Sequence, residues 1–340
     1  MKKIFFLIFL VNSTTIFSQV GGETVFQFLN LTSSSRQVAL GGEVLTLIND
    51  VNQPIWNPSV INPELDKQLS VNYTSYLAGI SIGSASYSQV INRSFGAIHG
   101  SVKYLNYGTL IEADENGIEK GTFKASDVAV SVGYAFNLPW TNIFMGFNGK
   151  LINSTISNFT SSGIAAADIA VLYYSPYKSY AFTMVARNMG TQIQSFDGTN
   201  EKLPFKVAIG GSYKLKYVPL KWHLTIDNLQ QWNVAVPNPS NQISDLEGNI
   251  TQEKISFLTN AIRHLVIGAE LFPESPINLR AGYNFRRSSE LKLQNARSFS
   301  GISFGFGIKL NKLRFNYAFS KYHAATSAST FSLQFDLDKR

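Results

Sequence analysis

The chain has 340 residues, a formal net charge of +7, 13% aromatic and 15% charged residues, and no cysteine. The lack of cysteine excludes a lipoprotein anchor, disulfide bonds and thiolate metal sites. The basic residues are scattered and form no patch with interleaved aromatic side chains, so binding to nucleic acid is not expected. No stretch approaches the roughly 20 apolar residues of a membrane-spanning helix, so a membrane protein with this sequence has to be a β-barrel.

Residues 1–18 have the pattern of a secretory signal peptide. Lys2 and Lys3 precede a short apolar run over residues 4–11, and cleavage is expected after Ser18. The apolar run is too short to cross roughly 30 Å of hydrocarbon as a helix. We therefore expect an exported protein whose mature form carries a net charge of +5, from 27 basic and 22 acidic residues.

Residues 19–68 do not alternate between polar and apolar. Val25, Phe28 and Leu29 have helical spacing, and the rest is punctuated by turn-forming residues. We interpret this segment as a small plug, or hatch. A periplasmic tail is the alternative, but a tail has little use for its large apolar residues, which are Phe26, Phe28, Leu40, Leu45, Leu47 and Trp56.

From residue 69 to the C-terminus, polar and apolar residues alternate, as expected of strands with one apolar and one polar face. A soluble β-sandwich shows the same alternation, but the export signal and the aromatic residues at strand ends favour an outer-membrane barrel over residues 69–340. The fold class is therefore all-β, with about fourteen antiparallel strands at 69–77, 78–88, 94–105, 125–136, 142–153, 163–174, 179–188, 204–215, 220–229, 262–272, 276–286, 298–310, 312–321 and 328–337.

The connections between these segments alternate in length. Short turns follow even-numbered strands and mostly long loops follow odd-numbered ones, which is the pattern of short periplasmic turns and long extracellular loops. The first connection, near Leu77–Gly79, breaks this rule. The predicted long loops cover 106–124, 154–162, 189–203, 230–261, 287–297 and 322–327.

The polar faces are expected to point into the barrel. On the lipid face an Arg or Lys near the midplane would cost roughly 2–4 kcal/mol. Fourteen strands enclose more space than their own side chains fill, and residues 19–68 are the available filler. The charged and histidine residues predicted to face the lumen are Asp127, Lys150, Asp168, Lys206, Lys214, Lys221, His223, Asp227, Glu270, Arg280, Arg286 and Arg314.

Motifs that would indicate catalysis or metal binding are weak. The Ser-x-x-Lys matches at 175–178 and 289–292 lack the companion motifs of penicillin-binding enzymes. The acidic run at 112–117 resembles half of a calcium loop, but Phe123 stands where a bidentate Glu is needed. The four histidines lie on separate strands or loops, which argues against a metal site. We expect neither enzymatic activity nor a cofactor.

Residues 33–61 resemble the N-terminal signature of the PorV/PorQ family of outer-membrane barrels. Stretches at 21–31, 123–127, 203–205, 263–264 and 279–287 resemble its PorQ-like branch, so the resemblance spans the mature chain. It implies a non-catalytic role in the type IX secretion system, anchoring a PorZ-like surface protein in an attachment complex with PorU and PorV, in contact with outer-membrane lipid and lipopolysaccharide. The hatch residues that carry it are Arg36, Gly41, Gly42, Asp50, Trp56, Asn57 and Pro58.

The long loops are expected to carry the partner contacts. Loop 230–261 is too rich in apolar residues to be freely solvated, which favours a protein-binding face, although packing against the barrel's own mouth explains it equally well. The candidate contact residues are Asp114, Phe196, Trp232, Phe257 and Leu258.

A FadL-like channel for small hydrophobic molecules remains the alternative function. In that case Gly96 and Gly100 would mark a kink and a lateral opening in the third strand. A deep apolar pocket behind the hatch would favour transport, and a closed, polar, filled bore would favour anchoring.

Overall fold

The computed structural model describes residues 24–340, apart from 93–94, 176, 197, 236–242, 245–249, 252–254, 292–298, 323–325 and 338–340. The predicted signal peptide, residues 1–18, therefore lies outside the described residues.

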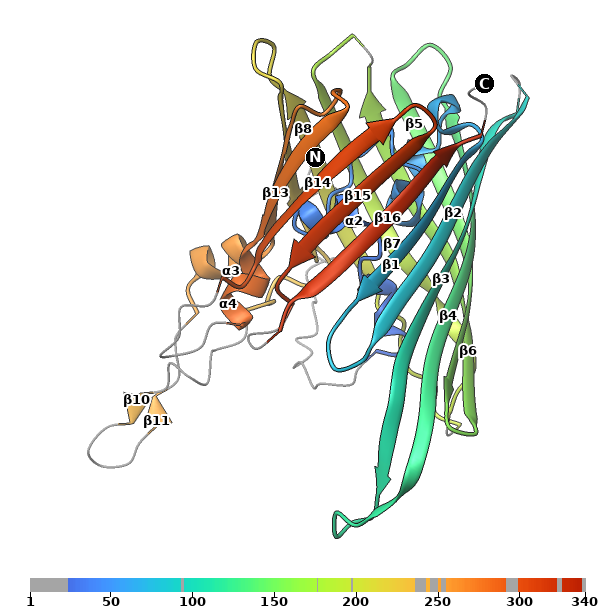
Figure 1. The fold of residues 1–340 in the computed structure, drawn as a ribbon, viewed down its shortest axis with the longest axis vertical. Helices are drawn as coiled ribbons and strands as arrows, with labels where there is room; N and C mark the ends of the chain where they lie inside the picture. The colour runs from blue at the N-terminus through green and yellow to red at the C-terminus, as the bar shows by residue number, and fades with distance from the viewer. Residues whose placement is uncertain are drawn as a thin grey trace, which may run out of the picture.

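Fourteen strands form one closed antiparallel barrel, in which each strand pairs with the next and β16 closes on β1 (Figure 1). This confirms the predicted fold class. The barrel strands are β1 (Gln68–Ser75), β2 (Ser81–Asn92), β3 (Gly96–Ala113), β4 (Glu119–Asn137), β5 (Ile143–Ile156), β6 (Phe159–Tyr174), β7 (Tyr180–Gln194), β8 (Lys206–Lys214), β9 (Leu220–Ile226), β12 (Leu265–Leu271), β13 (Ile277–Asn284), β14 (Ile302–Leu310), β15 (Leu313–Ser320) and β16 (Ala328–Asp336). A separate hairpin consists of β10 (Ile243–Ser244) and β11 (Ile250–Thr251).

The barrel has two different ends. At the short-turn end lie the turns that follow β2, β4, β6, β8, β12 and β14, and the long-loop end lies opposite it. The wall is uneven in height. The strands β3 to β7 have 14–19 residues, whereas β8, β9 and β12 to β15 have 7–9. As a result the β3–β4 hairpin projects far beyond the rest of the long-loop end (Figure 1). Two short helices, α3 (Phe257–Arg263) and α4 (Phe285–Glu290), stand on the low side.

Three predicted loops are partly strand, and these predictions were wrong. The largest part of loop 106–124 belongs to β3 and β4, loop 154–162 to β5 and β6, and the start of loop 189–203 to β7. In the β3–β4 hairpin nearly every residue from 107 to 122 is at least partly exposed. Both faces of this ribbon meet water, so its sequence has no reason to alternate. The first connection is also longer than predicted from the sequence, because β1 ends at Ser75 and β2 begins only at Ser81.

Outward-facing side chains of the wall are large and apolar. In β1, for example, Asn72 and Thr74 are buried inside, while Val71 and Tyr73 are about half exposed outside. Trp222, Leu224, Phe304 and Phe331 continue this belt on other strands. Soluble monomers rarely expose a contiguous apolar surface of this extent, so the belt is suited to lipid rather than to water.

None of the helices in the described part of the chain is long and apolar enough to cross a membrane.

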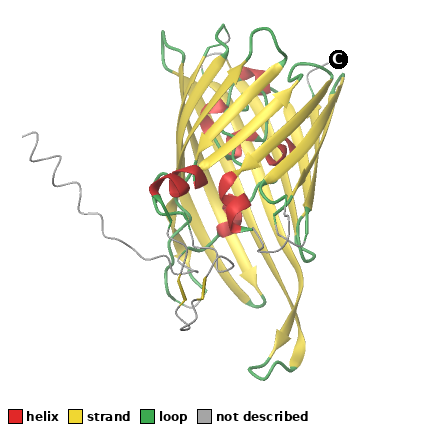
Figure 2. Ribbon diagram, turned by 90° about the vertical axis from the view of Figure 1, so that its left-hand side faces the viewer, coloured by secondary structure: helices red, strands yellow, loops and turns green. Residues whose placement is uncertain are grey.

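The hatch, residues 24–67, lies inside the barrel and runs from the long-loop end to the short-turn end (Figure 2). Thr24 bridges to Lys202 in the loop after β7, and the Asp66 carboxylate accepts a 2.6 Å hydrogen bond from the Val90 amide near the end of β2. A periplasmic tail is therefore excluded for this segment. The hatch contains η2 (Gln27–Asn30), α2 (Ser35–Ala39), η3 (Gln53–Ile55), η4 (Pro58–Val60) and η5 (Pro63–Leu65).

Glycines in the wall let the hatch backbone approach closely. A Cβ atom at Gly146 of β5 would lie 2.2 Å from the carbonyl carbon of Pro58. A Cβ atom at Gly282 of β13 would lie 2.2 Å from the amide nitrogen of Gly41. Gly41 itself has a φ of +99°, a conformation that side chains disfavour. Hatch and wall are thus in direct backbone contact at two points on different sides of the barrel.

Candidate functional site

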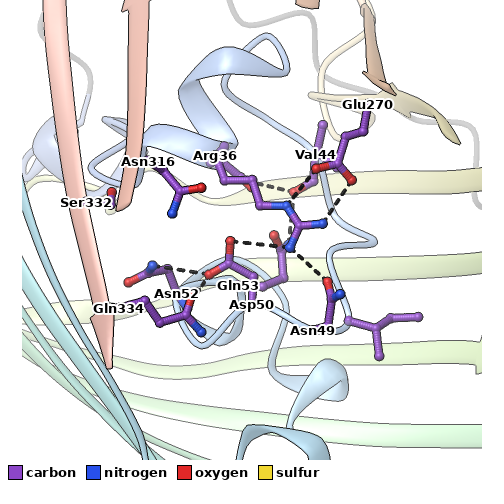
Figure 3. A network of polar contacts seen from close by, with 12 residues as sticks. Arg36, Val44, Asn49, Asp50, Asn52, Gln53, Glu270, Asn316, Ser332 and Gln334 are labelled. Atoms are coloured by element: carbon purple, nitrogen blue, oxygen red, sulfur yellow. Dashed lines mark hydrogen bonds and ion pairs between the residues drawn. The ribbon is translucent and has the colours of Figure 1, made fainter. Parts of the chain in front are cut away.

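The site is the interface between the hatch and the barrel interior, together with the long-loop end above it. Its centre is Arg36, which α2 places against β12 (Figure 3). The Arg36 Nε and Nη2 atoms donate to the two carboxylate oxygens of Glu270 at 2.8 and 2.9 Å. Its Nη1 donates to Asn49 Oδ1 at 2.8 Å and lies 3.9 Å from Asp50. This bidentate, buried pair joins the hatch to the wall.

Glu270 also connects three strands of the wall. Arg280 of β13 donates from Nε to Glu270 at 3.0 Å and from Nη1 to Asn316 of β15 at 2.9 Å. His223 of β9 lies 3.3 Å from Glu270 through Nε2, and its Nδ1 lies 2.9 Å from the Thr46 hydroxyl of the hatch. All of these groups, including Thr46 of the hatch, are buried. One carboxylate therefore holds two guanidinium groups and an imidazole.

A second ion-pair network lies nearer the long-loop end. Lys206 of β8 contacts Glu43 of the hatch at 2.6 Å and Asp227 at 3.2 Å. Arg286 contacts Asp227 at 2.8 Å. Burial alone would raise the pKa of the Glu43 carboxyl, but the ammonium of Lys206 and the guanidinium of Arg286 hold that pKa well below its usual range. Glu43 is therefore a carboxylate that the wall's cations keep ionised.

A third group of polar contacts lies on β3, β5, β6 and β7. Lys150 of β5 contacts Asp168 at 2.7 Å and Asn188 at 2.9 Å, and the Asn188 amide donates to Asp168 at 2.9 Å. Lys103 of β3 donates from Nζ to the backbone carbonyl oxygens of Phe28, at 2.7 Å, and of Leu31. Through Lys103 the wall holds the carbonyls at the end of η2.

The sequence signature of the hatch consists of residues with identifiable structural contacts. Asn57 accepts from the Ser59 amide at 3.1 Å, which caps η4, and its side-chain amide donates to Thr183 of β7 at 3.0 Å. The Arg187 guanidinium of β7 lies 4.0 Å from the ring centre of Trp56, a cation–π contact between wall and hatch. Asp50 accepts from the Asn52 amide at 3.0 Å in a local turn.

An apolar cluster fills another part of the bore near the long-loop end. Hatch residues pack there against inward side chains of the wall, and Tyr107 of β3 and Phe196 of the loop after β7 pack against the cluster. The buried members are Val25, Phe26, Phe28, Leu29, Ile82, Leu105, Ala129, Ile152 and Leu203. Along the hatch the interior is therefore filled, first by apolar side chains and then by charged pairs.

A small cleft lies at the short-turn end. It is lined by Gln68, Arg314 and Gln334 among others and has a volume of about 70 Å³. Pockets for small ligands usually measure roughly 300–1,000 Å³. This cleft is polar and too small to be a ligand site of that kind.

Of the predicted partner-binding residues, the structure brings three together and separates two. Trp232 stacks on Phe257 with ring centres 4.9 Å apart, and Leu258 is the next residue of α3. Asp114 lies in the tip of the β3–β4 ribbon, on another part of the rim (Figure 1), where its carboxylate accepts from the amides of Asn116 and Ile118 at 3.0 and 2.9 Å. Phe196 packs against the apolar cluster of the mouth.

The predicted lumen residues point inward, but equivalent ones were missed. Asp127, Asp168, Glu270 and others of the predicted set are buried, whereas the Lys214 side chain is 40% exposed at the short-turn end. His99, Lys103 and Arg187 were not predicted, although they occupy inward positions of predicted strands and are buried. The period-two alternation was sufficient to find them. Glu43 lies in the hatch, where no periodicity indicates direction.

In the described part of the chain, no cluster of three His, Asp or Glu side chains is arranged to hold a metal ion. The histidines there have other partners: His99 contacts the Val51 carbonyl at 2.9 Å, and His264 contacts the carbonyls of Asp227 and Trp232. Ser212 and His223 are paired in register on β8 and β9, but the ring nitrogens of His223 contact Thr46 and Glu270. His323 lies outside the described residues.

No protein-family model and no curated protein matches the chain. Among solved structures, the toluene transporter TbuX of Ralstonia pickettii is similar with a TM-score of 0.52 at 11% identity, covering 92% of this chain and 100% of that one. A FadL homologue of Pseudomonas aeruginosa has a TM-score of 0.49 at 9% identity, covering 90% and 98%. This chain shares the barrel fold of TbuX. At such identities the likeness shows the fold alone.

The lateral opening expected at Gly96 and Gly100 is absent, and that interpretation was wrong. From Ala97 to Asn106, β3 pairs without interruption with β2 on one side and with β4 on the other. Gly96, the first residue of β3, has a φ of +85° and pairs with Asn92, and Gly100 lies inside the continuous ladder. Both glycines are paired strand residues, so the wall is closed at this point.

Proposed function

We propose that this protein is an outer-membrane barrel that its own hatch keeps shut, and that it acts as a non-catalytic anchor for a surface partner. The observation that carries the proposal is the buried bidentate pair between Arg36 of the hatch and Glu270 of the wall. In the outer membrane, the short-turn end of the barrel would face the periplasm and the long-loop end would face the cell surface.

The buried ion pairs impose a large free-energy cost on displacing the hatch from the bore. Removing one partner from a buried ion pair typically costs about 3–5 kcal/mol, because the other charge is left uncompensated. Moving the hatch would uncouple Arg36 from Glu270 and Glu43 from Lys206, and would strip Lys103 of its carbonyl partners. A lumen closed in this way supports anchoring over conduction at rest.

The long-loop end offers an exposed element for docking. From residue 109 to 113, β3 pairs with β4 but with no other strand in the described chain, and the same holds for β4 from 119 to 123. Both edges of this ribbon therefore have backbone groups free to pair with an added strand. Ile111 and Ile118 are 60% and 62% exposed on it.

The resemblance to the PorV/PorQ family names the partner that fits this account. A PorZ-like surface protein would dock at the outer rim, in a type IX attachment complex with PorU- and PorV-like components and next to lipopolysaccharide. The ribbon around Asp114 is the part of the rim that we assign to this contact.

A second candidate is a FadL-like channel for small hydrophobic molecules. The fold supports it more directly than it supports anchoring, because the similar structure of highest TM-score above is a toluene transporter aligned over its whole length. The apolar cluster formed by Val25, Phe28 and Leu105 would offer such a molecule a compatible environment at the outer mouth. Passage would require the hatch to move or to rearrange.

One pair of experiments separates these functions. The tagged barrel is purified from outer-membrane extract under mild detergent, and co-purifying surface proteins are identified. In parallel, toluene uptake by cells that carry the wild-type barrel is compared with uptake by cells that lack it. Anchoring predicts a stoichiometric surface protein and no added toluene entry. Accelerated toluene entry with no co-purifying protein would replace anchoring by the channel function.

A further inference from the structure

Helix α3 exposes its apolar residues and buries its polar ones. Phe257 and Leu258 are 74% and 66% exposed, and Ile262 is 37% exposed. Asn260 and Arg263, on the opposite face, are buried. A helix on a water-covered surface has the reverse arrangement, with its apolar stripe toward the protein. The exposed face of α3 therefore needs an explanation other than contact with water.

Hydrogen bonds prevent α3 from rolling its apolar face inward. Asn260 Oδ1 accepts from the amides of Val234 and Ala235 at 3.1 and 3.0 Å. Directly after the helix, the ring nitrogens of His264 lie 2.6 and 2.9 Å from the carbonyl oxygens of Asp227 and Trp232. At the other end Ser256 accepts from the Thr259 amide at 3.1 Å and caps the helix. The outward orientation is thus built into the polar contacts.

The position of α3 continues the apolar belt of the wall. The helix leads directly into β12, where Leu265 pairs with Ile226 of β9 on the outer face. Both β9 and β12 have only seven residues. A tilted strand needs about 9–11 residues to cross the apolar core of a membrane. The wall is therefore too short on this side, at the level where α3 adds apolar surface (Figure 1).

We propose that α3 lies in the outer leaflet of the membrane, with Phe257, Leu258 and Ile262 against lipid acyl chains. The stack of Trp232, 45% exposed, on Phe257 gives this face the aromatic residue typical of a membrane boundary. The inference rests on the proposed insertion of the barrel in a membrane. It assigns Trp232, Phe257 and Leu258 to lipid, and it leaves the β3–β4 ribbon for the protein partner.

The absence of cysteine from the chain makes a direct test simple. Single variants Leu258→Cys, Leu224→Cys and Glu115→Cys are labelled with bimane and reconstituted in phosphatidylcholine vesicles that contain doxyl-labelled phosphatidylcholine. Leu224 faces outward on β9 and is 46% exposed, so it serves as the lipid-facing control. Glu115 lies at the exposed tip of the ribbon and is the water-facing control. All three side chains are exposed, and folding is checked by heat-modifiable migration.

The proposal predicts that bimane at position 258 is quenched several-fold more than at 115, and to an extent similar to that at 224. Quenching at 258 equal to that at 115, while 224 is quenched, overturns the placement of α3 and leaves the inserted barrel intact. A label at 258 that responds only after outer-membrane proteins are added identifies a protein as the occupant and also overturns it. If 224 is unquenched as well, both the placement of α3 and the proposed function fail.

Discussion

Arg36 and Glu270, separated by 234 positions in the chain, form a bidentate ion pair with both side chains almost completely buried. The pair couples the hatch to β12, while Arg280 on the neighbouring strand shares the same carboxylate. A buried pair of this kind is weak evidence for added stability in itself, but its disruption is costly. It therefore determines where the hatch rests in the bore.

Substitution Glu270→Gln is expected to destabilise the folded barrel by about 3–5 kcal/mol, because Arg36 and Arg280 lose their shared counter-charge while they stay buried. Denaturant unfolding followed by tryptophan fluorescence measures this change. The matched control is Glu274→Gln, which removes an acid that is 75% exposed and paired with Lys214, and a change within roughly 0–1 kcal/mol is expected there. Equal effects of both substitutions would show that burial of the pair has no energetic role.

The hatch is expected to lose stability in acid through Glu43. Its folded-state pKa lies well below the ordinary value of 4.5, so the contribution is complete above about pH 4.5 and is lost as pH falls from there towards the folded-state pKa. Glu43→Gln should flatten this part of the profile. Protease accessibility of the hatch between pH 3 and pH 6 is the measurement. A wild-type profile identical to that of Glu43→Gln would contradict the role of Lys206 and Arg286 as its counter-charges.

Gly146→Val is expected to interfere with the hatch, since a Cβ atom there would meet the Pro58 backbone at 2.2 Å. Backbone cannot yield as a flexible side chain does, so folded yield should fall, and any inserted barrel should leak ions in a planar bilayer. Gly149→Val in the same strand is the control, because no atom lies within 4 Å of a Cβ atom there. If the Gly146→Val barrel folds in normal yield and shows no ion leakage, then η4 does not pack against this glycine.

Shortening the ribbon should release the surface partner without affecting insertion. A variant in which residues 109–121 are replaced by a two-residue turn keeps β3 and β4 intact where they pair with β2 and β5. We expect the co-purifying protein to be lost and heat-modifiable migration to remain. A second variant, with residues 236–254 shortened and Trp232 and α3 retained, separates the two loops. Retention of the partner in the first variant and loss in the second would move the contact to the loop before α3.

The sequence predicted the barrel because one face of each strand meets lipid. In β13, Ile277, Leu279 and Ala281 alternate with inward Asn278 and Arg280, so the period of two is visible without a structure. Prediction failed where that asymmetry ends. Both faces of the β3–β4 ribbon are exposed to water, so its residues do not alternate between polar and apolar. Helix α3 has its apolar face outward, so its sequence does not indicate which face meets the protein.

The hatch contacts were predictable only as residue types. That Glu270 and Arg280 face the lumen follows from alternation, but that Arg36 meets Glu270 depends on how an irregular segment threads the bore. The path of the hatch is set partly by close backbone contacts at glycines such as Gly146 and Gly41. A single sequence does not reveal these contacts. Glu43 and its partners Lys206 and Arg286 are likewise brought together only by the folded hatch.

The most direct test of a barrel kept shut by its hatch is the ion conductance of the purified protein in a planar lipid bilayer. The wild-type barrel is predicted to insert without conductance steps, whereas a variant lacking residues 24–65 is predicted to give stable steps from the unobstructed fourteen-stranded bore. A wild-type barrel with steady conductance equal to that of the deletion variant would contradict the account, because the hatch would then leave the bore open.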